Sequence, residues 1–314
     1  MRVKQVITSL ILCFSSLVIF AQSDAKFGKL GKHEIDRNSC DYDSTAGAEM
    51  LFQLGKLRFD IAPDEVDWIF KFERHYRLKV YDKSVLPTHH ISFEVYRPKK
   101  KQAGIEVDDL KATVYQLKDG KVYKTKISES DFEKVRTDDY HIRYTFRYPD
   151  LKAGDIIEYK YTEKGPIQLL NGSFLLSPNF PTRFVKMECQ IPDYIQYRMV
   201  TRGRGATFSE ERNRVVQTVN VSYRKNASGG LIRSGVNGST GKTGTTVSQR
   251  EDMRLEIDCI KSTIVADSVS RNILLPYSLN LESLTPGLGI QLISFRSEIS
   301  GFHDLSTTAI ELGN

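Results

Sequence analysis

A cysteine and a histidine near the end of the chain have the clearest potential for chemistry. Cys259 and His303 could act as a nucleophile and its base, because a thiolate needs a nearby imidazole and a third group that orients the ring. Cys259, however, falls on the inward phase of a strand-like segment, where a small buried thiol is expected. Asp304 directly follows His303, and adjacent side chains of an extended chain point to opposite faces. The sequence therefore predicts no catalytic dyad here.

Other short motifs also lack a complete set of chemical groups. Residues 238–243 contain the Gly-Lys-Thr of a phosphate-binding loop, but Val236 stands where that loop needs its first glycine. The adjacent His89 and His90 diverge on an extended chain and have no carboxylate at ligand spacing. Three close carboxylate pairs fall in polar, turn-like stretches that we interpret as solvated loops: Asp108-Asp109, Glu129-Asp131 and Asp138-Asp139. We predict no catalytic, cofactor-binding or metal-binding residue, and no cofactor.

Trp68 and the fifteen tyrosines offer one alternative, a stacking platform for glycans or peptides. Aromatic residues that alternate along strands are more often part of a core, and we favour that interpretation.

The N-terminus has the order of a secretory signal peptide. Arg2 and Lys4 give a positive start, residues 6–20 carry no charge, and Ala21 is a small residue before the expected cleavage site. We interpret Cys13 as part of the removed signal. The sequence thus predicts an exported protein, in the periplasm or at the cell surface of a Gram-negative bacterium, with no membrane span after cleavage.

Charge and cysteine content limit the function classes. The net charge of +6 falls to +4 when Arg2 and Lys4 leave, and acidic residues are spread among basic ones, which argues against a nucleic-acid partner. After processing, an oxidising compartment permits one disulfide and leaves one thiol. The sequence does not say which of Cys40, Cys189 and Cys259 would pair.

Alternation of apolar and polar residues dominates the chain and predicts β-strands. The clearest case runs through Tyr140, Tyr144 and Phe146, and a second runs from Phe72 through Tyr76, with Arg74 as an exception in its apolar phase. Residues 112–127 predict a hairpin around Asp119-Gly120, and residues 149–154 predict a turn. Residues 46–57 fit a helix or a strand, and residues 64–70 could hold one helical turn.

The pattern predicts an all-β fold, with an antiparallel β-sandwich as its main domain. We divide the chain into four parts. Residues 1–21 are the signal peptide and 22–205 the β-sandwich domain. Residues 206–249, of which 226–249 are rich in Gly, Ser and Thr, are a flexible linker. Residues 250–314 form a weakly patterned, β-rich tail, truncated or diverged.

Several segments, in order, resemble one family. They include Arg77-Leu78-Lys79-Val80-Tyr81, residues 110–115, residues 119–122 and, as the most specific part, residues 146–161. Over about residues 40–203 the chain is similar to the domain-of-unknown-function family that precedes transglutaminase-like domains in Gram-negative envelope proteins. The resemblance implies a β-sandwich without assigned catalytic residues. Within that frame we interpret Glu158 and Lys160 as a solvated strand face.

The expected function is a non-catalytic envelope module that positions or contacts a partner domain or another envelope component. Two alternatives stay open. One is a truncated cysteine transglutaminase or protease, and the other is a glycan- or peptide-binding domain. The sequence leaves the partner, the oligomeric state and any catalytic domain beyond Asn314 open.

Overall fold

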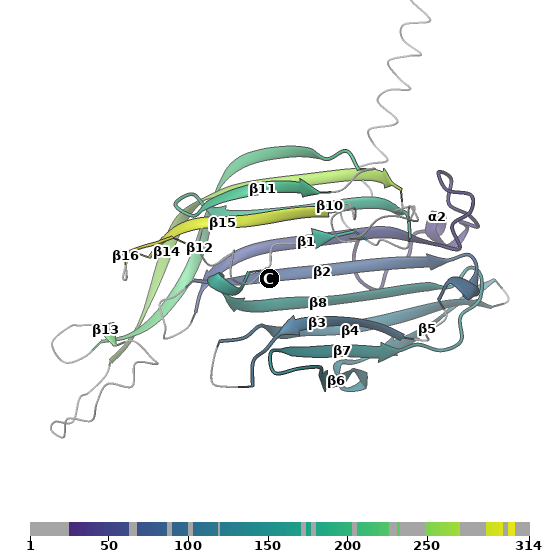
Figure 1. Ribbon diagram of the computed structural model, residues 1–314, viewed down its shortest axis with the longest axis horizontal. Coiled ribbons are helices and arrows are strands. Elements are labelled where there is room, and N and C mark those ends of the chain that lie inside the picture. The colour runs from purple at the N-terminus through teal and green to yellow at the C-terminus, as the bar shows by residue number, and fades with distance from the viewer. Residues whose placement is uncertain are drawn as a thin grey trace, which may run out of the picture.

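A computed structural model describes most of the chain between residues 25 and 304 (Figure 1). The described residues are 25–62, 68–86, 90–99, 103–118, 120–170, 174–176, 180–202, 206–225, 231–232, 249–270, 287–297 and 301–304. Both ends, including the predicted signal peptide, lie outside them.

One nine-stranded sheet forms the body of the molecule. Its only parallel neighbours among the described strands are β1 and β10, and the other pairs are antiparallel. From one edge to the other the strands are β13 (Leu231–Ile232), β12 (Ser209–Lys225), β14 (Gln249–Val269), β10 (Thr182–Pro192), β1 (Ala48–Ile61), β2 (Trp68–Val80), β8 (Ile156–Pro166), β4 (Glu106–Lys118) and β5 (Lys121–Ile127).

Two smaller sheets pack against one face of the long sheet (Figure 1). One contains β9 (Phe174–Leu175), β11 (Gln196–Arg202), β15 (Gly287–Ser297) and β16 (Gly301–Asp304), and the other contains β3 (His90–Tyr96), β6 (Glu133–Arg136) and β7 (His141–Arg147). The described helices are short: α2 (Lys32–Ile35) and the 3-10 turns η1 (Lys83–Val85), η2 (Glu129–Asp131) and η3 (Ile167–Leu169). The predicted all-β class is confirmed.

The main core lies between these layers because apolar side chains of the long sheet alternate toward the smaller sheets. Phe72, Phe146 and Phe174 are fully buried there. Phe93 of β3 stacks on Tyr161 of β8 with ring centroids 3.9 Å apart, which joins the three-stranded sheet to the long one. Burial of these large rings supplies much of the energy that holds the layers together.

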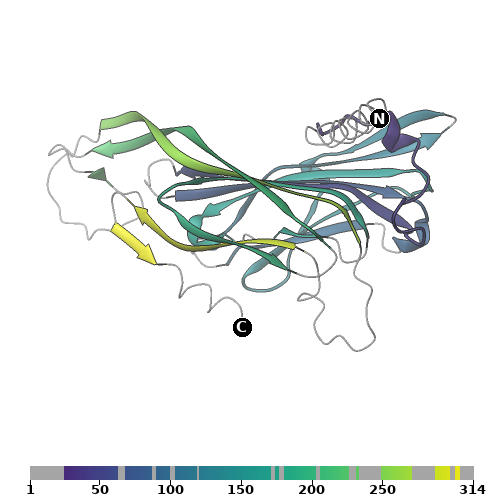
Figure 2. The same cartoon turned by 90° about the horizontal axis from the view of Figure 1, so that it is seen from above.

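The opposite face of the long sheet carries a different cover. Residues 25–46, here called the N-terminal segment, run across it and include α2, which Figure 2 shows on the far side of the sheet from β15. Leu30 packs there against Leu51, Tyr115 and Ile156. A face that would otherwise meet solvent is therefore enclosed.

Two turns have the geometry that their sequences predict. Gly120 adopts φ +72° between β4 and β5, and Gly154 adopts φ +95° before β8. Glycine reaches positive φ without a steric penalty, so both chain reversals can be tight. The second turn connects two different sheets, because β7 belongs to the three-stranded sheet and β8 to the long one.

Two segments that the sequence left open or assigned to a helix are strands in the structure. Residues 48–57 lie in β1, so the helical alternative for 46–57 is wrong; the strand pairs on both sides, with β2 and β10. Trp68 to Phe70 begin β2, so the predicted helical turn over 64–70 is wrong there, while 63–67 lie outside the described residues.

The predicted flexible linker, residues 206–249, begins too early in the chain. Residues 209–225 form β12, and each of its seventeen residues is paired with β14. Strand β14, from the predicted tail, lies between β12 and β10 in the long sheet. Cross-strand pairing, which a short-range pattern does not report, gives these polar residues their extended structure. Most of 226–248 lies outside the described residues.

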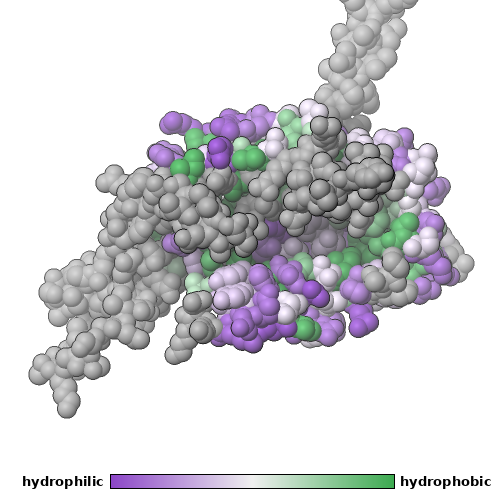
Figure 3. Space-filling model, viewed as in Figure 1, coloured by the Kyte–Doolittle hydropathy of each residue, from purple (hydrophilic) through white to green (hydrophobic). Residues whose placement is uncertain are grey.

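The outward face of the three-stranded sheet is polar. Figure 3 shows mainly hydrophilic residues over this part of the molecule, and Arg143 of β7 lies 2.6 Å from Glu94 of β3.

Among the described residues, no helix combines the length and apolar character needed to cross a membrane.

Candidate functional site

The three cysteines of the described chain are buried and free. Burial raises the pKa of the Cys259 thiol to about 11, and the charge of Asp193 adds to the effect. Burial also raises the pKa values of Cys40 and Cys189. A thiol with a raised pKa and little exposure is a poor nucleophile at neutral pH.

The residues that could assist Cys259 belong to a different sheet from it. Cys259 lies in β14 of the long sheet, whereas His303 and Asp304 lie in β16 of a smaller sheet. The thiol is instead 3.8 Å from the side-chain oxygen of Gln217 and 3.6 Å from the backbone oxygen of Ile257.

The other candidate residues are dispersed. Trp68 is buried beside Tyr194, with ring centroids 5.7 Å apart, and so belongs to the core. The three carboxylate pairs are exposed in β4, in η2 and before β7. Residues 238–243 and His89 lie outside the described residues. In the part that the structure describes, no three His, Cys, Asp or Glu side chains form a group that could hold a metal ion.

The most concentrated set of ionisable groups lies under the N-terminal segment. We call it the Glu158 cluster, and its members are Glu34, His75, Arg77, Tyr115 and Glu158. Glu158 is 0% exposed. Its Oε1 is 2.8 Å from His75 Nε2 and accepts from Arg77 Nη2 at 2.6 Å, while its Oε2 accepts from the Tyr115 hydroxyl at 2.5 Å.

The N-terminal segment supplies the remaining partners of this cluster. The backbone N–H of Gly28 donates to Glu158 Oε2 at 3.0 Å. Arg77 Nη1 donates to both oxygens of Glu34, at 2.6 and 2.8 Å, and Nη2 donates to the carbonyl of Lys29 at 2.9 Å. Charged groups of the sheet therefore bind the segment that covers them.

Further polar groups hold the same segment at other points. Lys79 Nζ donates to the carbonyl of Ile35 at 3.0 Å and to that of Gly154 at 2.7 Å. Near the end of the segment, Arg183 Nη2 is 3.2 Å from Asp41, and its Nε is 2.7 Å from buried Glu49. The segment is thus bound along most of its length.

The electrostatics favour a charged Glu158. Burial alone would raise the pKa of Glu158, but the His75 hydrogen bond, the Arg77 charge and the Tyr115 hydroxyl together hold the pKa below its ordinary value. A carboxylate, an imidazole and a phenol could perform acid–base chemistry. Here each of them faces the N-terminal segment or another cluster member, so the contacts that we observe bind one part of the chain to another.

The predicted solvated face around Glu158 is therefore wrong. The alternation correctly places Glu158 and Lys160 on the polar face of β8. The N-terminal segment covers that face, so it is not exposed to solvent as predicted. Lys160 is only half-buried and pairs with Glu73 at 2.7 Å. A signal was present in the sequence: β2 places Glu73, His75, Arg77 and Lys79 on one phase, and complementary charges recur at Glu158 and Lys160.

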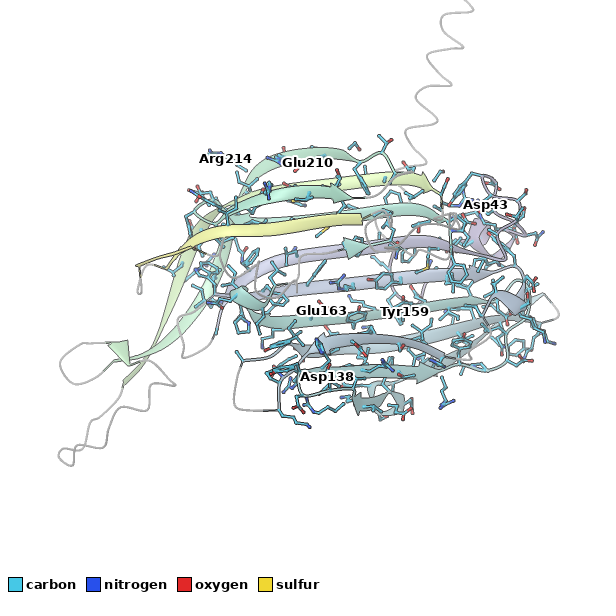
Figure 4. All side chains as sticks on the ribbon, viewed as in Figure 1. Asp43, Asp138, Tyr159, Glu163, Glu210 and Arg214 are labelled. Atoms are coloured by element: carbon cyan, nitrogen blue, oxygen red, sulfur yellow. The ribbon has the colours of Figure 1, made fainter. Side chains whose placement is uncertain are left out.

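A second buried ion pair lies on the opposite face. Arg74 Nε donates to Glu163 Oε1 at 3.0 Å, and Nη2 donates to Oε2 at 3.3 Å. The Arg74 guanidinium also lies 4.1 Å above the Phe72 ring. Figure 4 shows Glu163 and Tyr159 along β8. The exception in the apolar phase of β2 is thus a paired charge within the core.

The fold and the cluster define an all-β protein in which one long sheet carries two smaller sheets on one face and a bound N-terminal segment on the other. The profile of the family described as "Domain of Unknown Function with solved-structure structure (DUF3857)" matches residues 71–227, which is half of the chain. The chain belongs to this family. The predicted membership of a domain-of-unknown-function family is confirmed, with boundaries later in the chain than the predicted 40–203, while the association with transglutaminase-like domains stays a prediction.

The solved structures that are similar to this chain share little of its sequence. No curated protein matches the chain. A solved structure from Parabacteroides distasonis ATCC 8503, described as a "putative protease", has 11% identity and a TM-score of 0.49, and the match covers 78% of this chain and 40% of that protein. An M1 zinc metallopeptidase from Deinococcus radiodurans has 9% identity and a TM-score of 0.24, with 70% of this chain and 42% of that protein covered.

Proposed function

We propose that this chain is an exported, non-catalytic β-sandwich module that positions or binds a partner domain in the cell envelope. The observation that carries the proposal is the Glu158 cluster. Its acid–base groups contact the N-terminal segment and one another, and Arg77 and Glu158 are almost completely buried. Groups used in this way are unavailable to a substrate while the segment is bound.

The thiols support the same proposal. Cys259 is 1% exposed and Cys189 is 0% exposed, and burial raises the pKa of each. A cysteine peptidase or transamidase needs a thiolate that a substrate can reach. The proposal of export rests on the signal-like N-terminus, with its positive start and uncharged residues 6–20.

An activity assay tests the non-catalytic part directly. The purified protein, its Cys259→Ala variant and its Glu158→Gln variant are incubated with a casein substrate and with a primary amine donor. We expect neither peptide hydrolysis nor amine incorporation above a no-protein control. Activity of the unmodified protein that is lost in either variant would overturn the proposal.

Export is tested separately by expressing the full chain in a Gram-negative host and weighing the mature protein after cell fractionation. We expect a periplasmic or surface protein that begins at Gln22. A cytoplasmic protein that retains residues 1–21 would contradict this part.

A further inference from the structure

Strand β12 leaves a long backbone edge without a strand partner. All its residues pair with β14, but only Arg224 and Lys225 also pair with β13. Among the described strands, residues 209–223 therefore bond on one side only. Figure 1 shows β12 starting at the upper border of the sheet and bending down toward β13 at the lower left. Such an edge presents backbone N–H and C=O groups that another extended chain can pair with.

A pocket of about 500 Å³ lies at this part of β12. Three consecutive residues of β12 line it, Arg212, Asn213 and Arg214, together with residues from the end of β10 to the start of β11 and with Ile260 of β14. Successive side chains of a strand point to opposite faces, so a pocket that touches three in a row reaches the strand backbone as well. Ile260 of β14 is paired with Arg214, so the pocket lies over the face of β12 and β14, beside the free edge. A strand added to that edge would reach the pocket with its side chains.

Of the two arginines that line the pocket, Arg212 has an acidic partner and Arg214 has none among the described residues. Arg212 is held by Glu210, with Nε to Oε1 at 2.6 Å and Nη2 to Oε2 at 3.0 Å. Arg214 is exposed, and in the described part of the chain it forms no ion pair or hydrogen bond through its side chain. Figure 4 shows Arg214 and Glu210 at the same border of the molecule. A guanidinium in this state is suited to a carboxylate.

We infer that the free edge of β12 receives an extended peptide segment, which places one acidic side chain in this pocket, on Arg214. The inference rests on the proposed function, because it specifies the partner as a strand-forming peptide. Val216 follows Arg214 on the same strand face and is 62% exposed. The segment should therefore carry an apolar side chain two positions from its acidic one.

Asp193 limits the charge of the partner. It is exposed at the same pocket, so its carboxylate repels a second acidic group on the peptide. The chemistry favours one acidic residue among neutral, β-branched neighbours over a uniformly acidic tail.

The test uses a fluorescein-labelled heptapeptide, Thr-Val-Thr-Glu-Thr-Val-Thr, with the full chain. Two matched probes carry Lys in place of Glu, or N-methyl groups on alternate backbone amides. We expect saturable binding of the first probe, slower amide exchange over residues 209–223 when it is bound, and weaker binding of both other probes. The Arg214→Glu substitution should lower the affinity for the first probe by about tenfold or more.

Two further variants keep the result interpretable. Lys121→Glu makes the same charge change on exposed β5, at the opposite edge of the sheet, and should leave binding unchanged. Val216→Lys places a charge on the β12 edge and should weaken binding without altering Arg214. Circular dichroism confirms that each variant folds.

Several results would overturn the inference. They are the absence of saturable binding, equal binding to the Arg214→Glu variant, or equal binding of the N-methylated probe, which would indicate contact with a carboxylate alone. The proposed function is judged separately by the hydrolysis and amine-incorporation assays, so either can fail while the other stands.

Discussion

Arg77 contacts two carboxylates at once, Glu34 through Nη1 and Glu158 through Nη2, each at a closest distance of 2.6 Å. Glu34 belongs to α2 in the N-terminal segment, and Glu158 belongs to β8 of the long sheet. One buried guanidinium therefore connects a segment near the start of the chain to a strand more than 120 residues later.

Replacing Arg77 should destabilise the fold strongly. Arg77→Leu leaves Glu158 and Glu34 buried without their main cation, and breaking a buried ion pair in this way costs about 3–5 kcal/mol. The free energy of unfolding, measured by urea titration, should fall by that amount.

The matched control is Arg143→Leu, which removes a surface ion pair with Glu94. Exposed pairs contribute at most about 1 kcal/mol. If the two substitutions cost the same, the Glu158 cluster does not have the energetic role that its burial indicates.

Acid should weaken the cluster. The folded-state pKa of Glu158 is lowered, so its contribution to stability is complete above the unfolded-state pKa of about 4.3 and is lost as pH falls through the lower folded-state pKa. The free energy of unfolding of the native protein should approach that of the Glu158→Gln variant as pH falls from about 7 to about 3.

Carboxylates outside the cluster, such as Glu188, titrate equally in both proteins, so the difference between the two curves reports the Glu158 cluster. A stability difference that is constant with pH would mean that Glu158 is not charged in the folded state.

The buried thiols should resist modification. Because burial raises the pKa of Cys259 to about 11 and Cys40 and Cys189 are also buried, a thiol-reactive disulfide reagent at neutral pH should react slowly with the folded protein. In guanidinium chloride the same three thiols should react at the rate of free cysteine. Rapid reaction of Cys259 in the folded state would identify an accessible, activated thiol.

Local patterns predicted much of this fold. The alternation through Tyr144 and Phe146 matches β7, and Gly120 and Gly154 mark chain reversals with positive φ. Such features depend on neighbours in sequence. Residues 46–57 were ambiguous because β1 is covered on both faces, which removes much of the alternation that distinguishes a strand.

The Glu158 cluster could not be predicted in the same way. Alternation identifies the polar phase of β8 but does not say what covers it, and the cover comes from residues 25–46. Likewise, Arg74 stood out in its apolar phase, yet its partner Glu163 lies 89 positions away. The extended structure of residues 209–225 depends on pairing with β14, whose residues follow a long Gly/Ser/Thr-rich stretch.

Amide hydrogen exchange over residues 26–36 tests the central claim most directly, namely that the cluster binds the N-terminal segment to the sheet. We predict slow exchange at Gly28 and Gly31, whose N–H groups donate to Glu158 and Glu34, and faster exchange of 26–36 in the Arg77→Leu variant but not in Arg143→Leu. Exchange of residues 26–36 in the native protein at the rate of an unstructured peptide would contradict the account.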